Sequence, residues 1–284
     1  MTDQTDDREI GDDVRAMRAT ELGEAEFVLA RAERASAETK QRLGLRTARI
    51  GGGVVAVAAN DPTGGFFNVC VGLGQDERLT AAVLEEVTAF ATEAQAPLLC
   101  LQVAPGADPE EWAELLTGAG AAPSRSWVKF ATEHPAVPTA ETALRIDRLG
   151  PEHGADFGRV FTLGFGMPLE GGLPEWFAEI PTWEGFTTYG AWDDDELIGA
   201  ANLFVSEHSA VLAGAATLPE RRGRGAQSAL MARRIADAHA LGARWVTSET
   251  GAETPETPNP SLHNMRRIGL SERYERQNWI WRRG

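Results

Sequence analysis

The residues best suited to chemistry lie in one short turn, "RRGRGAQS" (221–228), where glycines alternate with arginines. A loop that holds a diphosphate must bring several backbone N–H groups within about 3 Å of its oxygens. A Cβ atom obstructs this approach, so Gly223 and Gly225 suit such a loop. The alanine-rich segment that follows would add the free amides and the positive dipole end of a helix. We therefore predict that the amides of residues 223–227 bind phosphate.

The arginines of this turn have two interpretations. Arg222 and Arg224 can pair directly with phosphate oxygens, or they can be solvated residues of a basic turn that caps a helix. A buried strand pattern precedes the turn and an amphipathic helix pattern follows it without a gap. That context favours the phosphate site over the basic turn.

The elements around the turn follow from hydrophobic periodicity. The helix after it carries apolar residues on one face, at Met231, Ile235, Ala238 and Leu241. Two further helices are predicted at 152–165 and 259–269. Strands are predicted at 142–149, 186–193, 196–205, 209–218, 243–250 and 272–283.

Two short matches indicate that the chain is a duplication. "RATELG" (18–23) resembles "RIDRLG" (145–150), and "SRSWVKF" (124–130) resembles "ERQNWIWRR" (275–283). The second pair is farther apart, which predicts an insertion in the second half, at 167–185.

The first half differs from the second where the phosphate turn should be. It has Gly72 and Gly74, but Asp76 and Glu77 stand in place of the arginines and would repel a diphosphate. We predict a degenerate, non-catalytic domain at 14–135 and a catalytic domain at 136–284. A weakly patterned linker falls at 131–143, and an acidic, disordered N-terminus at 1–13.

The turn resembles the signature of the GNAT superfamily of acetyl-CoA-dependent N-acetyltransferases, Arg/Gln-x-x-Gly-x-Gly/Ala. Arg222, Gly225 and Gln227 occupy its fixed positions, although Gln227 replaces the usual small residue. The resemblance covers about 142–284. It implies an α/β (α+β) fold of two tandem GNAT-like domains. Each would have a mixed, mostly antiparallel sheet with helices on both faces and splayed strands 4 and 5.

The resemblance also implies a coenzyme site, with acetyl-CoA as co-substrate. The backbone of Ala215 and Thr217 would pair with the pantetheine arm, and Asn259 or Asn264 on the last helix would contact the coenzyme. Asn259 is alternatively a simple helix cap. The pyrophosphate would lie on a further set of residues: Arg222, Gly223, Arg224, Gly225, Ala226, Gln227 and Ser228.

Catalysis needs a base to deprotonate the amine, because an alkylammonium titrates near pH 10. The first candidate is Glu249, at the end of a predicted strand, followed by Glu207 and His208. The family's usual tyrosine acid falls on Met265, so Tyr274 is the candidate acid, with Ser248 as an alternative. Each is alternatively a solvated or packing residue.

The aromatic segment 167–185 and the residue after it have two interpretations. Trp176, Phe177, Trp183 and Phe186, interleaved with glutamates, predict a pocket for an organic cation. The same residues suit a helix face that packs on the other half of the chain.

Composition argues against several classes of partner and of metal site. A net charge of −15 argues against nucleic acid or an anionic membrane as a partner. The start of the chain lacks a signal-peptide pattern, and Cys70 and Cys100 lie in apolar runs, so we expect buried thiols in a cytoplasmic protein. The histidines and cysteines show no metal-ligand spacing.

We therefore predict a metal-free monomer or homodimer that acetylates the amine of a small molecule. The alternatives are a non-catalytic acyl-CoA-binding or regulatory protein, and a protein-lysine acetyltransferase.

Overall fold

The computed structural model describes residues 6–105 and 109–284, and its strands form one twelve-stranded sheet. Along the sheet the order is β1-β2-β3-β4-β12-β5-β11-β9-β8-β7-β6, with β10 paired to β8. The strands are β1 (Leu45–Ile50), β2 (Gly53–Ala58), β3 (Val69–Val71), β4 (Leu98–Gln102), β5 (Ala121–Glu133), β6 (Arg145–Leu149), β7 (Phe186–Asp193), β8 (Glu196–Val205), β9 (Ala210–Val211), β10 (Ala215–Thr217), β11 (Trp245–Gly251) and β12 (Glu272–Arg282).

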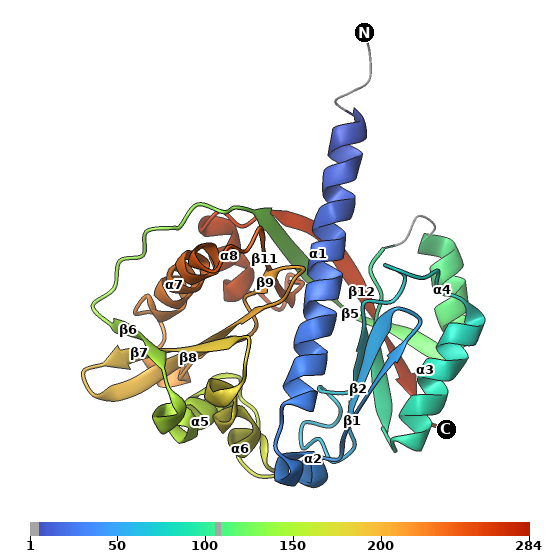
Figure 1. The fold of residues 1–284 in the computed structure, drawn as a ribbon, viewed down its shortest axis with the longest axis horizontal. Helices are drawn as coiled ribbons and strands as arrows, with labels where there is room; N and C mark the ends of the chain where they lie inside the picture. The colour runs from blue at the N-terminus through green and yellow to red at the C-terminus, as the bar shows by residue number, and fades with distance from the viewer. Residues whose placement is uncertain (1–5, 106–108) are drawn as a thin grey trace.

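Helices cover both faces of this sheet (Figure 1). The α-helices are α1 (Asp6–Glu33), α2 (Ala37–Leu43), α3 (Ala81–Glu93), α4 (Pro109–Gly118), α5 (Gly154–Gly164), α6 (Leu173–Ala178), α7 (Ala226–Ala240) and α8 (Pro260–Arg267). Three short 3₁₀ turns are η1 (Pro151–His153), η2 (Ile180–Thr182) and η3 (Pro219–Arg221).

The two halves repeat one order of elements. In the first half, β1 to β3 lead through α3 to β4, which runs parallel to β3. In the second, β7 to β9 lead through β10 and α7 to β11, which runs parallel to β9. The remaining pairings are antiparallel. The predicted tandem fold with mixed, mostly antiparallel sheets is confirmed.

The last strand of each half pairs with the other half. The C-terminal strand β12 lies between β4 and β5, and β5 pairs along its second part with β11. Trp127 and Trp279, which the sequence comparison matched, lie on β5 and β12. Because of this exchange the two halves share one continuous sheet.

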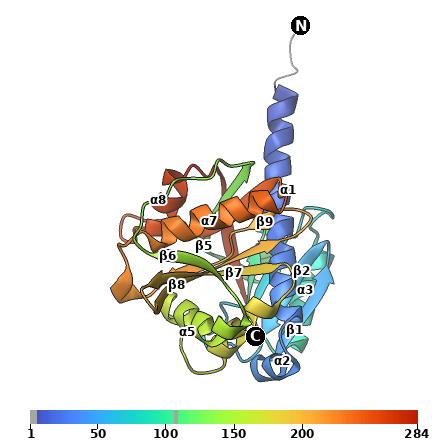
Figure 2. The same ribbon diagram turned by 60° about the vertical axis from the view of Figure 1, so that its left-hand side comes forward.

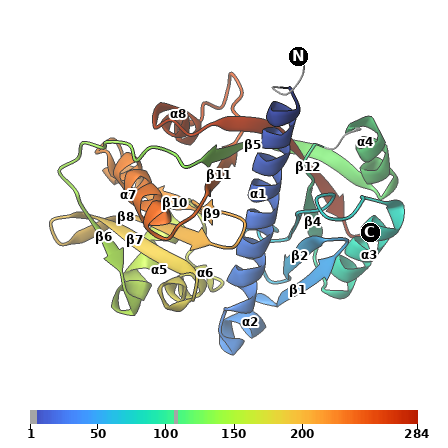
Figure 3. The same ribbon diagram turned by 45° about the horizontal axis from the view of Figure 1, so that its top comes forward.

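Helix α1 lies across the sheet between the two halves (Figures 1 and 3). Ala25, Val28 and Leu29 pack on β2 and β3 of the first half. Two other groups on the same helix reach the second half: Ala16 and Ala19 cluster with Trp245, and Phe27 and Ala30 with Phe204, Val211 and Ala213. One helix therefore covers the same face of both halves.

The opposite face of the second half is covered by α7 and α8, whose apolar side chains share a core with β5, β8, β9 and β11. Figure 2 shows α7 and α5 on opposite sides of the strands β7 and β8. This arrangement leaves the turn before α7 on the α7 side and α1 on the other side of the same strands.

The acidic N-terminus differs from its prediction. Residues 6–13, expected to be disordered, form the first turns of α1, while residues 1–5 lie outside the described residues. Arg273 of β12 is 3.5 Å from Asp12 and 3.3 Å from Asp13, so the acidic turns have a cationic partner from the far end of the chain. Sequence reading missed this long-range contact.

One of the two sequence matches is not a structural repeat. Residues 18–23 lie in α1, whereas 145–149 form strand β6. The segment 167–185, expected to be an insertion, contains α6, which has the same place in the order of elements as α2 of the first half. Residues 134–144 connect β5 to β6, and the first three residues of the expected linker 131–143 lie in β5.

Candidate active site

The site surrounds a gap between β10 and β11. The gap opens where the parallel pairing of β9 with β11 ends. Leu212 still donates its backbone N–H to the Thr247 carbonyl at 2.8 Å. Gly214 then adopts a left-handed conformation (φ 62°), and the chain continues as β10, which pairs only with β8. From this point β10 and β11 separate, which is the predicted splay.

Backbone hydrogen-bonding groups of β10 face the gap, where the Thr217 carbonyl also accepts a long bond from Arg222 at 3.4 Å. Leu218 donates to the Ile198 carbonyl at 2.9 Å and is opposite it in register, so by the antiparallel alternation Ala216 bonds to β8 as well. The N–H and C=O groups of Ala215 and Thr217 therefore point away from β8, toward β11. Both residues are partly exposed, as positions for an added strand must be.

The turn before α7 leaves room for a ligand. Gly223 and Gly225 have left-handed φ values of 81° and 83°, and a Cβ on Gly223 would meet no atom within 4 Å. Gly225 is the N-cap of α7 and has no side chain to accept from the first amides of that helix, and no other described side chain is recorded accepting from them. An open cradle before an uncapped helix N-terminus fits a diphosphate.

The arginines of the turn have protein partners. Arg224 forms a double contact with Asp193 in the turn between β7 and β8, with one bond at 2.7 Å. Arg222 reaches the Gly164 carbonyl at 3.1 Å and the Thr217 carbonyl at 3.4 Å. In this arrangement the turn presents amides to a ligand, and Arg224 is held away by its carboxylate.

Polar side chains of α8 meet the first turn of α7. Gln227 donates to Ser261 at 2.9 Å and accepts from Asn264 at 2.5 Å. Arg267 bonds both Ser228 and Asn264. Three predicted coenzyme residues, Gln227, Ser228 and Asn264, are therefore brought together beside the turn.

Asn259 caps α8, in agreement with its alternative interpretation. Its side-chain oxygen accepts from Ser261 N at 3.0 Å and from Leu262 N at 3.4 Å, and its amide donates to Thr250 and Gly251 of β11. The cap therefore fixes the start of α8 to the end of the strand that borders the gap.

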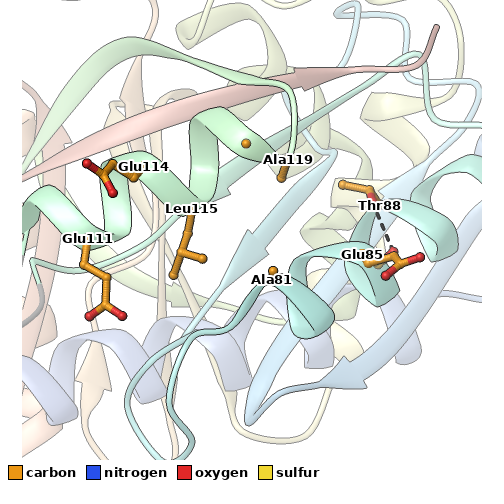
Figure 4. A pocket seen from close by; sticks show the side chains of 8 residues that line it. Ala81, Glu85, Thr88, Glu111, Glu114, Leu115 and Ala119 are labelled. Atoms are coloured by element: carbon orange, nitrogen blue, oxygen red, sulfur yellow. Dashed lines mark hydrogen bonds between the residues drawn. The ribbon is translucent and has the colours of Figure 1, made fainter.

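The corresponding turn of the first half is filled. A Cβ on Gly74 would lie 2.4 Å from the ring of Trp112. Leu73 and Leu79 are buried, and Thr80 caps α3 by accepting from Val83 N at 3.3 Å. A groove of about 520 Å³ lies between α3 and α4, and Figure 4 shows the side chains that line it. Its lining includes the acidic residues Glu85, Glu111 and Glu114, which disfavours an anionic ligand.

Glu249 lies at the gap, within a buried charged cluster under α1. It is the first β11 residue on that face beyond the Thr247 link, and its side chain remains 28% exposed. Lys129 Nζ donates to its carboxylate at 2.6 Å and Arg276 at 3.1 Å. The same two cations bind Glu24 of α1, and Arg276 also binds Glu21. Three carboxylates face two cations, so one negative charge is in excess.

This environment shifts the pKa values of the two carboxyls in opposite directions. Burial raises the pKa of Glu249, as does the nearby Glu24, and together they outweigh Lys129 and Arg276. Burial also acts to raise the pKa of Glu24, but Arg276 and Lys129 more than offset it and hold it far below its ordinary value. Glu249 is therefore the member of the cluster best able to accept a proton.

Tyr274 and His208 have different places. The Tyr274 hydroxyl donates to Glu21 at 2.5 Å, and burial followed by Glu21 raises its pKa, so it belongs to the same cluster as Glu249. His208 lies in the turn before β9. Ala210 pairs with Val246, so His208 precedes the parallel pairing of β9 with β11, whereas Glu249 follows it. The structure does not bring His208 to the gap.

The predicted aromatic pocket is mostly core. Trp176, Phe177 and Trp183 are 1%, 2% and 7% exposed, and the ring of Trp176 packs edge-on against Phe67 of the first half. Phe186 is only partly buried. Buried rings offer no face to an acceptor, so the first three hold the halves together, which corrects their assignment to substrate binding.

The interleaved glutamates support this packing role. Glu179 accepts hydrogen bonds from the Ser36 amide, the Ser36 hydroxyl and the Thr39 hydroxyl, which fixes the start of α2. Glu175 is 3.8 Å from Arg42 of the same helix. The segment is thus a docking element for α2.

Sequence reasoning missed the residues that surround Glu249. Lys129 in "WVKFA" and Arg276 in "YERQN" are charges inside strands, and both are at most 1% exposed. A charge at an inward strand position was the available signal. Their partners Glu21 and Glu24 gave none, because α1 is rich in charge along its length.

The remaining predictions concern thiols, metals and membranes. Cys70 and Cys100 are free, and burial raises the pKa of Cys100 to about 11. Within 6–105 and 109–284, no three His, Cys, Asp or Glu side chains are grouped to hold a metal ion. None of the helices described there is long and apolar enough to cross a bilayer.

Solved structures show where this fold occurs. A GCN5-related N-acetyltransferase from Kribbella flavida superposes with a TM-score of 0.59 at 17% identity, covering 89% of this chain and 96% of that one. One from Sphaerobacter thermophilus gives 0.56 at 17% identity, covering 95% and 94%. A tandem GNAT protein from the clavulanic acid biosynthesis pathway gives 0.56 at 16% identity, covering 83% and 79%.

Sequence comparison agrees with the structures. No curated protein sequence matches this chain, but residues 160–257 match the profile of the acetyltransferase (GNAT) family. The matched range contains the gap, the glycine turn, α7 and Glu249. Residues 160–257, in the second half, therefore match the acetyltransferase (GNAT) family, and the whole chain has the fold of these tandem structures.

Proposed function

We propose that the second half transfers an acetyl group from acetyl-CoA to the amine of a small molecule. The observation that carries this proposal is the continuity of three features: the splayed strands β10 and β11, the open Gly223 turn and the uncapped α7. Bound acetyl-CoA supplies an activated acetyl group. In this proposal the backbone of Ala215 and Thr217 bonds its arm, and the amides of 223–227 bind its diphosphate.

Glu249 is the proposed general base. Its carboxylate accepts a proton from the acceptor ammonium, and the neutral nitrogen then forms a bond to the acetyl carbon as the carbon–sulfur bond breaks. The second proton of the nitrogen leaves with the sulfur as a thiol. Lys129 and Arg276 are positioning residues, because they orient the carboxylate through hydrogen bonds.

The position of α1 favours a small acceptor. On the side of the gap opposite α7, Phe27 and Ala30 of α1 pack over Val211 and Ala213 at the end of the β9 segment. A protein lysine with its flanking chain needs an open groove, and α1 crosses that face. The acceptor is therefore proposed to enter between the two halves.

A non-catalytic coenzyme-binding role has one observation in its favour. The family's tyrosine position is Met265, which is 7% exposed and packs in the core, and Tyr274 donates its hydroxyl to Glu21. Release of free thiol from acetyl-CoA in the presence of an amine panel separates the two roles. Coenzyme binding without thiol release above background would favour the binding role.

Glu249→Gln tests the base. We expect kcat to fall about 100-fold, in the range typical for loss of a general base, with the affinity for acetyl-CoA unchanged. The base works only when deprotonated, so kcat/KM of the parent should fall as the pH drops through a pKa above that of an ordinary glutamate. The variant should lack this limb.

The matched control is Glu133→Gln, which changes a strand glutamate paired at the surface with Arg244. It should keep both kcat and the pH profile. An unchanged pH profile in Glu249→Gln would contradict the assignment.

A further inference from the structure

An unpaired arginine lies on the acceptor side of the gap. Arg31 of α1 is only partly exposed, and no carboxylate or carbonyl within the described residues bonds its guanidinium. Its Nε is buried without a hydrogen-bond partner. Leaving a buried cationic donor unpaired is costly, so this feature calls for an explanation.

Aromatic rings hold the guanidinium in place. Its central carbon lies 5.3 Å from the ring centroid of Phe27, 4.9 Å from that of Phe67 and 5.3 Å from that of Trp176. The Trp176 indole also donates to the Arg31 carbonyl at 3.2 Å. Rings around the guanidinium fix it while its edge keeps donors for an oxygen pair.

The nearest carboxylates are committed elsewhere. Asp61 accepts hydrogen bonds from Thr63, Gly65 and Phe67 within its own loop. Glu24 is bound by Lys129 and Arg276. Burial lowers the pKa of Arg31 to about 10, with Asp61, Glu24 and Glu249 acting against that shift, so the guanidinium stays charged at neutral pH. The Nη groups, which bond no other described residue, are the donors that an anion from outside the chain could use.

Arg31 lies on the same face of α1 as Glu24, which belongs to the cluster of the proposed base. Glu24, Phe27 and Arg31 follow each other at helical spacing on α1, and long side chains on a helix lean toward its N-terminus. The guanidinium therefore lies over Phe27, about one turn from Glu24, which shares its two cations with Glu249. Phe27 also packs with Val211 and Ala213 beside the gap.

We propose that the acceptor carries an anionic group as well as its amine, as an amino acid does. Arg31 binds the anionic group and Glu249, in a cluster with one excess negative charge, faces the ammonium. The inference rests on the transferase function proposed above and adds the chemical class of the acceptor. Its recognition element comes from the non-catalytic half.

The test compares acids with their amides. Coenzyme A-saturated protein is titrated by calorimetry with each common amino acid and with its carboxamide, and acetyl-CoA-dependent thiol release is followed with the same compounds. At least one amino acid should bind 10-fold or more tighter than its amide. Arg31→Gln should abolish that difference and leave acetyl-CoA affinity unchanged.

Arg46→Gln is the matched control, because Arg46 also lies over a ring, that of Phe90, but pairs with Glu93 at the surface of the first half. It should keep the preference for acids. Equal binding of acids and amides, or a preference that survives Arg31→Gln, would overturn the inference. Acid-selective binding without thiol release would support the anion site and refute the transfer function. Thiol release that is equal for acids and amides would support the transfer function and refute the anion site.

Discussion

The turns 71–80 and 218–226 follow the same strand in the two halves, yet their surroundings are opposite. In the first half the glycines are covered by Ala25 and Trp112, and the Thr80 side chain caps the next helix by accepting from the Val83 amide. In the second half Gly223 borders open space and α7 has no side-chain cap. The comparison indicates that the second turn, and not the first, leaves room beside its backbone amides for the proposed ligand.

The two halves also differ in whether their parallel strands separate. In the first half β3 and β4 stay paired through Val71 and Gln102, and the chain then turns directly at Gly72. In the second half pairing ends at Thr247, and β10 continues on the far side of the gap. The first half instead contributes α1, which supplies Glu21, Glu24 and Arg31 to the face of the second.

The largest expected effect comes from breaking the cluster that joins the halves. Arg276→Met leaves Glu21 and Glu24 short of a cation at a fully buried site and should lower the free energy of unfolding by about 3–5 kcal/mol. Urea denaturation measures this loss, and the shared sheet predicts one cooperative transition for both halves. Arg49→Met, which breaks the exposed pair with Glu26, should cost less than about 1 kcal/mol. Equal losses would contradict the cluster's role.

A smaller effect is expected from adding charge to the open turn. Gly223→Asp should weaken acetyl-CoA binding about 10-fold or more, because a carboxylate beside the diphosphate is repelled. Gly223→Asn has nearly the same shape, and both residues tolerate left-handed φ better than other side chains. Calorimetry should show a much smaller loss for Asn. Identical losses would mean that shape, not phosphate charge, is sensed there.

The smallest effect tests the filled turn. Thr80→Ala removes the cap of α3 and should cost about 1 kcal/mol of unfolding free energy. Coenzyme affinity should stay the same, because this helix start is proposed to bind no phosphate. A change in acetyl-CoA affinity would indicate that the coenzyme binds the first half, which would contradict the proposal.

Local patterns predicted the second half well. Strands β7 and β8 have the predicted bounds, and the turn, α7 and α8 lie where glycine and capping signals place them. Asp76 and Glu77 correctly indicated a different turn in the first half, but Trp112, which covers Gly74, comes from α4 and could not be assigned by sequence neighbours.

Long-range features escaped prediction. The exchange of β5 and β12 depends on pairing between distant strands, and both strands have the same local pattern wherever they pair. The composition of the aromatic residues in 176–186 is compatible with either a binding pocket or a packed core. Only their burial in the structure distinguishes the two. The roles of Lys129 and Arg276 depend on α1, which carries their carboxylate partners and also Arg31. No local pattern predicts where α1 lies.

The central claim is that one half binds the coenzyme and the other does not. Calorimetric titration of the full chain with acetyl-CoA tests it most directly. The account predicts one equivalent per chain, weakened by Gly223→Asp and unaffected by Thr80→Ala. Two equivalents, or a single equivalent that is indifferent to Gly223→Asp, would contradict it.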